Sequence, residues 1–90
     1  MISAQLELIE NFIDQENYEE AIAILVKHLK EDEPDPSIYA YLGLAHFLAE
    51  QEINAQEFWA SLLLSFNNGA KVLISVIKKE ASNRLEKNSF

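Results

Sequence analysis

Apolar residues recur along the chain at intervals of three and four, which is the spacing of one face of an α-helix. Near the start, Leu6, Ile9, Phe12 and Ile13 follow this spacing, and the chain shows no strand-like alternation of apolar and polar residues. Five stretches of this kind, separated by polar turns, predict five helices and an all-α fold. The helices are expected at about residues 3–15, 18–30, 36–50, 53–66 and 70–87.

Residues typical of helix starts lie between these stretches. Asp35 is a natural N-cap, directly before a proline that suits a first helical turn. Asn17 with Glu20, and Asn54 with Glu57, have the spacing of a capping box. In that motif an N-cap side chain and a glutamate three residues later bond each other's backbone N–H groups. A stop for the fourth helix is expected at Asn67, Asn68 and Gly69, because Asn and Gly tolerate the left-handed conformation.

The chain resembles itself when it is shifted by one fixed number of residues, equal to the separation of Leu8 from Leu42. We call this separation the repeat interval. Shifted back by this interval, Leu42, Ala55, Trp59 and Leu63 fall on Leu8, Ala21, Leu25 and Leu29. Gly43 falls on Ile9, so the earlier unit keeps the apolar character but lacks the glycine. Small residues such as Gly43 and Ala55 allow packed helices to approach closely, and we expect Trp59 to fill the space around them.

The residues Tyr39, Leu42, Gly43 and His46, followed by Ala55 and Trp59, resemble a tetratricopeptide (TPR) repeat, whose pattern is W-x2-L-G-x2-Y…A-x3-F. The resemblance implies one domain over 1–90, with helix–turn–helix repeats at about 2–33 and 36–66. A C-terminal capping helix would follow at about 70–87. The alternative from the pattern alone is a five-helix bundle without repeat order.

TPR proteins bind other proteins in a concave groove lined by the first helix of each repeat. The resemblance therefore implies a non-catalytic interaction module that binds a peptide or a helix, or that self-associates as a homodimer. Its partner-binding residues would be Glu7, Glu10, Asp14, Tyr41, Leu44, Phe47, Lys71 and Lys78. The phrase from Tyr39 to Trp59 is also similar to TPR segments ahead of bacterial glycosyltransferases and methyltransferases. The alternative is thus an N-terminal docking domain of a larger enzyme.

Charge narrows the range of partners. The formal net charge is −8, and residues 1–35 hold ten acids against two lysines, whereas residues 67–90 carry five bases against two acids. An acidic body disfavours binding to nucleic-acid phosphates and to anionic membranes. We therefore expect a protein partner, with no nucleic acid and no membrane.

The chain shows no constellation typical of catalysis. Cysteine is absent, and no phosphate-binding glycine loop, zinc-binding helix motif or nucleophile elbow occurs. His46 and Glu50 lie four residues apart but have no third ligand or nucleophile nearby in the sequence. No enzyme activity, cofactor or metal is expected. The start of the chain has no basic region and carries acids within its first ten residues, unlike a signal peptide, so we expect a cytoplasmic protein.

Overall fold

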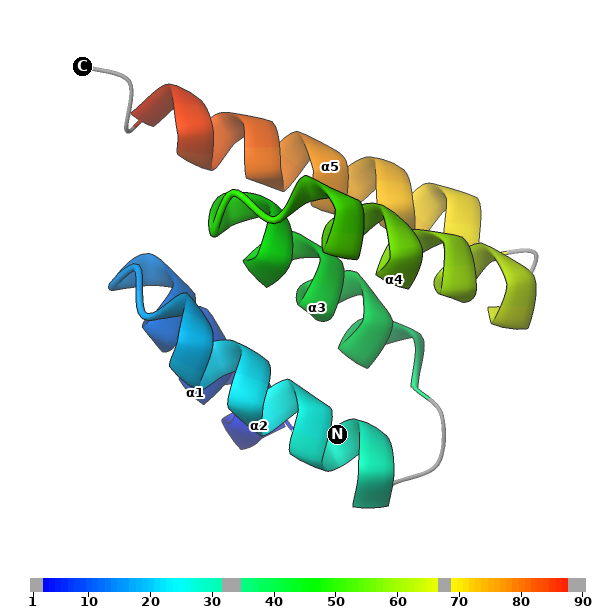
Figure 1. Ribbon diagram of the computed structural model, residues 1–90, viewed down its shortest axis with the longest axis horizontal. Helices are drawn as coiled ribbons and strands as arrows, with labels where there is room; N and C mark the ends of the chain where they lie inside the picture. The colour runs from blue at the N-terminus through cyan, green and yellow to red at the C-terminus, as the bar shows by residue number, and fades with distance from the viewer. Residues whose placement is uncertain (1–2, 32–34, 67–68, 88–90) are drawn as a thin grey trace.

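The computed structural model describes residues 3–31, 35–66 and 69–87, and these form five α-helices without a strand (Figure 1). The all-α fold is therefore confirmed. Every predicted helix boundary lies within two residues of the observed one, whereas the expected stop at Asn67 and Asn68 lies outside the described residues. The helices are α1 (Ser3–Asp14), α2 (Tyr18–Glu31), α3 (Pro36–Leu48), α4 (Glu52–Phe66) and α5 (Ala70–Lys87).

Helix α3 lies at the centre of the molecule, with α2 on one side and α4 and α5 on the other (Figure 1). Helix α1 packs chiefly on α2. A helix enclosed in this way must be apolar nearly all round, and the sequence of α3, PSIYAYLGLAHFL, meets that requirement. Its fully buried apolar side chains are Ile38, Ala40, Leu42, Leu44 and Ala45.

The N-terminus of α3 has the predicted cap. The backbone N–H of Ser37 donates to Oδ1 of Asp35 at 2.8 Å, and Pro36 occupies the first turn. A proline at this position loses no helical hydrogen bond, because the first N–H groups of a helix have no partner within it. Asp35 and Pro36 thus begin the central helix at a defined residue.

The helix boundaries recur at the interval found in the sequence. Helices α1 and α3 end one repeat interval apart, at Asp14 and Leu48. Helices α2 and α4 begin one repeat interval apart, and so do α3 and α5. Neighbours along the chain also pack on one another, as α1 does on α2 and α3 does on α4. This arrangement fits a helical repeat of two helix pairs followed by one further helix.

The turn after α1 is a Schellman motif, the common end of an α-helix in which one residue adopts the left-handed conformation. Glu16 has a φ of 62°, and the N–H of Asn17 donates to the carbonyl oxygen of Phe12 at 2.8 Å. The predicted capping box of Asn17 and Glu20 is wrong, because it needs this same N–H of Asn17. The Schellman motif already uses it.

The turn after α3 repeats this motif one repeat interval later. Glu50 has a φ of 64°, and the N–H of Gln51 donates to the carbonyl oxygen of His46 at 2.8 Å. Helix α4 begins directly afterwards, at Glu52. The predicted capping box of Asn54 and Glu57 is wrong, because Asn54 already lies within the helix. Two turns of equal geometry thus join the helices of each pair.

The contact between α3 and α4 centres on the indole ring of Trp59. The ring is 2% exposed, its Nε1–H donates to the carbonyl oxygen of Ala40 at 3.4 Å, and the ring of Phe47 lies 5.8 Å away. The indole lies against Gly43, where a Cβ atom would stand 2.5 Å from Cδ1 and Cε2 and closer still to Nε1. Gly43 is therefore required by the bulk of Trp59, and Ala55 is fully buried in the same core.

Gly43→Ala tests this requirement. The added methyl group overlaps a buried, rigid ring, so the free energy of unfolding should fall by about 1–3 kcal/mol, the usual cost of overpacking. Gly69→Ala is the matched control, since a Cβ there meets no heavy atom of the described residues within 4 Å. Urea titration followed by the fluorescence of Trp59 measures both variants, and equal midpoints would contradict this role of Gly43.

Glu50→Gly tests the strain of the second turn. Glycine adopts positive φ without the steric cost that a side chain brings, so the fold should gain about 0.5–1 kcal/mol. The same substitution at Glu57, which is exposed within α4, should instead cost about 0.5–1 kcal/mol through the low helix propensity of glycine. Thermal unfolding by circular dichroism compares the two, and a shift of the same sign in both would refute the interpretation.

Candidate functional site

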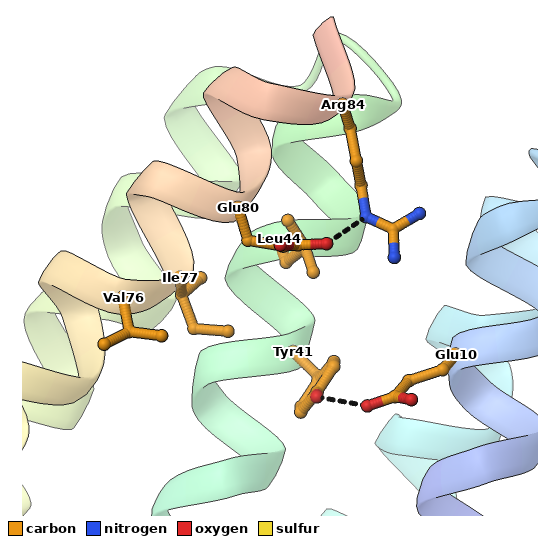
Figure 2. Close-up of a pocket in the computed structure, with 7 residues that line it drawn as sticks. All are labelled: Glu10, Tyr41, Leu44, Val76, Ile77, Glu80 and Arg84. Carbon is orange, nitrogen blue, oxygen red and sulfur yellow. Dashed lines mark hydrogen bonds and ion pairs between the residues drawn. The ribbon is translucent and has the colours of Figure 1, made fainter. Parts of the chain in front are cut away.

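A cleft of about 260 Å³ lies between α1, α3 and α5 (Figure 2). It is smaller than most small-molecule pockets, which enclose roughly 300–1,000 Å³. Among the described residues, those that line it come from the first helix of each pair and from α5. They are Glu10 of α1, Tyr41 and Leu44 of α3, and Val76, Ile77, Glu80 and Arg84 of α5.

The floor of the cleft is apolar. Leu44 and Ile77 are only 1% and 5% exposed, so each belongs to the core and shows the cleft a small part of its surface. Val76 is 58% exposed and lies at the rim beside Ile77 (Figure 2). A half-exposed valine next to a buried leucine and isoleucine offers an apolar contact to any side chain that enters.

Tyr41 connects the floor to α1. Its hydroxyl group donates to Oε1 of Glu10 at 2.7 Å, across the gap between α3 and α1 (Figure 2). Burial raises the pKa of Tyr41, and the negative charges of Glu10 and Glu80 raise it further, while Arg84 acts in the opposite direction. The phenol is therefore held in its neutral, donating form.

Arg84 closes one end of the cleft by joining α5 to α1. Its Nη1 lies 2.6 Å from Oδ1 of Asp14, and its Nε lies 2.9 Å from Oε1 of Glu80. Partial burial lowers the pKa of Arg84, but the hydrogen bonds and charges of Asp14 and Glu80 outweigh it, so the net shift is upward. The guanidinium thus stays charged and bridges two helices that lie far apart in the sequence.

The polar groups of the cleft are mostly acidic. Glu10, Glu80 and the adjoining Asp14 carry three carboxylates, against the single guanidinium of Arg84. The cleft therefore has a net negative charge that its own side chains do not neutralise.

The structure brings together half of the residues that the sequence predicts for partner binding. Glu10, Tyr41 and Leu44 line the cleft, and Asp14 holds Arg84 at its end. Glu7 is exposed on α1 but does not line the cleft.

The other predicted residues lie elsewhere. Phe47 is turned toward Trp59, with ring centroids 5.8 Å apart. Lys78 also approaches Trp59, its Nζ 5.4 Å from the ring centroid, in the geometry of a cation–π contact. Lys71 is exposed near the start of α5, outside the lining of the cleft.

The side chains that α5 contributes to the cleft were missed by the sequence reasoning. One repeat interval after Tyr41 and Leu44, the equivalent positions on α5 are Ser75 and Lys78. In the structure, Ile77 and Glu80 line the cleft instead. The residues that α5 presents to the cleft therefore differ from those that the repeat interval predicts. The sequence does hold one signal for an ion pair on α5: Arg84 is the only arginine in the chain and has a glutamate four residues before it.

His46 contacts residues close to it at the turn after α3. Nδ1 of His46 lies 2.5 Å from Oε1 of Gln51, and its ring stacks on Phe58 at 5.3 Å, so it packs at the turn between α3 and α4. Within 3–31, 35–66 and 69–87, no group of three or more His, Asp or Glu side chains is placed to hold a metal ion. Nor does any helix in these ranges have the length and apolar character needed to cross a bilayer.

Comparison with known proteins identifies no relative. No protein-family model matches the sequence, and neither a curated protein nor a solved structure matches it. The function is therefore inferred from the geometry of the cleft.

Tyr41→Phe tests the bond across the cleft through its pH dependence. The pKa of Tyr41 is raised in the fold, so the folded state keeps a proton that the unfolded state loses near pH 10. The stabilising contribution is then present below about pH 10 and is lost as the pH rises further. At pH 7 the variant should lose about 1.5–3 kcal/mol, as expected for a hydrogen bond to a charged group.

Urea denaturation of both proteins between pH 7 and pH 11 measures this effect. The stability of the natural chain should fall more steeply above pH 10 than that of Tyr41→Phe. Parallel curves would show that the pKa of Tyr41 is not raised in the fold, and equal stabilities at pH 7 would show that its hydroxyl group does not stabilise the fold.

Proposed function

We propose that the chain is a non-catalytic protein-interaction module of TPR type, and that the cleft between α1, α3 and α5 receives the partner. One observation carries the proposal: the cleft is lined by the first helices of the two pairs and by the next helix in the series. This is the surface on which TPR proteins bind their partners. The recurrence of helix boundaries and turns at the repeat interval supports the same assignment.

The side-chain chemistry of the cleft supports the binding of a protein partner. Glu10 is hydrogen-bonded to Tyr41, and Glu80 is paired with Arg84. These groups stabilise one another in fixed pairs. An apolar floor beneath such pairs is suited to an anchoring side chain of a partner.

Val76→Arg tests the proposed function. The substitution places a long side chain at the exposed rim of the cleft and should abolish capture of the partner without unfolding the domain. Leu64→Arg is the matched control, because Leu64 is 84% exposed on α4 and does not line the cleft. The immobilised natural chain and both variants are compared by mass spectrometry of the proteins that each retains from an extract of the source cells.

The expected result is a set of proteins retained by the natural chain and by Leu64→Arg but lost with Val76→Arg. Circular dichroism confirms that each variant is folded. The proposal fails if the natural chain retains no protein specifically, or if Val76→Arg retains the same set.

A further inference from the structure

We infer that the cleft binds a basic segment of its protein partner. An arginine or lysine side chain would lie beside the carboxylates of Glu10 and Glu80, and a neighbouring aliphatic side chain would contact Val76 and Ile77. This inference rests on the proposed function and adds to it the chemistry of the partner.

The charge of the cleft is the first argument. Glu10 and Glu80 line the cleft and Asp14 adjoins it, so there are three carboxylates against the single guanidinium of Arg84, and the chain as a whole has a formal net charge of −8. An acidic peptide or a nucleic acid would be repelled here, whereas a basic segment is attracted both at a distance and in contact. Complementary charge therefore selects a cationic occupant.

The carboxylates also retain the capacity to accept further hydrogen bonds. An ionised carboxylate offers about four lone-pair sites. Glu10 accepts one hydrogen bond from Tyr41, and Glu80 accepts one from Arg84. The side chain of Glu80 is 45% exposed, so an incoming donor can reach it.

The contacts of Arg84 show that carboxylates at this site bind a guanidinium group. The guanidinium of Arg84 lies between Asp14 and Glu80, with N–O distances of 2.6 Å and 2.9 Å. Bonds of this kind, between charged groups, are among the stronger hydrogen bonds in proteins. A second guanidinium or an ammonium group beside Glu10 and Glu80 would make the same kind of contact.

The apolar floor defines the rest of the occupant. Val76 is more than half exposed, and the buried Leu44 and Ile77 line the cleft with it. The cleft volume of about 260 Å³ lies below the roughly 300–1,000 Å³ of most ligand pockets. It therefore suits a few side chains of a segment that runs across its mouth. The apolar stems of arginine and lysine fit such a floor as well.

A random library of short peptides displayed on phage, selected against the immobilised full chain, tests the inference. The enriched peptides should carry net positive charge and an aliphatic residue close to an arginine or lysine. The tightest synthetic peptide should lose about tenfold or more in affinity with Glu10→Gln or Glu80→Gln, as expected for a lost charged contact. Glu57→Gln on α4 is the matched control and should leave the affinity unchanged.

The outcomes separate a failure of the inference of a basic partner from a failure of the proposed function. Enriched peptides that are neutral or acidic, yet fail to bind Val76→Arg, would overturn the basic partner and leave the proposed function standing. Basic peptides that bind Glu10→Gln and Glu80→Gln as tightly as the natural chain would also overturn the inference, because their attraction would then be general. If no enriched peptide depends on Val76, both proposals fail.

Discussion

The packing of Trp59 against Gly43 is the contact on which the rest of the structure depends. The indole ring could not approach α3 this closely if that position carried a side chain, so the missing Cβ of Gly43 sets the distance between α3 and α4. With α4 in place, α3 is enclosed and can be apolar on nearly every side. The central helix then presents Tyr41 and Leu44 toward the cleft from a rigid position.

Much of the fold was predictable because its rules are local. The spacing of apolar residues located all five helices, and Asp35 with Pro36 marked the start of α3. The turns were harder to predict. Glutamate is an unusual residue at positive φ, so neither Glu16 nor Glu50 signals a left-handed turn by its own preference. The packing of the helices on both sides of each turn imposes that conformation.

The candidate site was predictable in part on α1 and α3 but not on α5. Helices α1 and α3 keep the repeat interval, so Glu10, Tyr41 and Leu44 lie near the expected surface. Helix α5 instead buries Ile74 and Ile77 and presents Lys78 to the ring of Trp59. Periodicity alone does not determine the rotation of such a helix, because only its contacts with α3 and α4 select which apolar residues face inward.

The pair of Arg84 and Asp14 has a consequence for folding cooperativity. Most helix packing here joins elements that are close in sequence, which favours rapid folding and lets an array fray from its ends. This ion pair connects residues separated by 70 positions and so couples α1 to α5 directly. An exposed pair contributes only about 0–1 kcal/mol. The two end helices are therefore weakly coupled, and we expect the pair of α3 and α4, which share the most extensive packing, to unfold last.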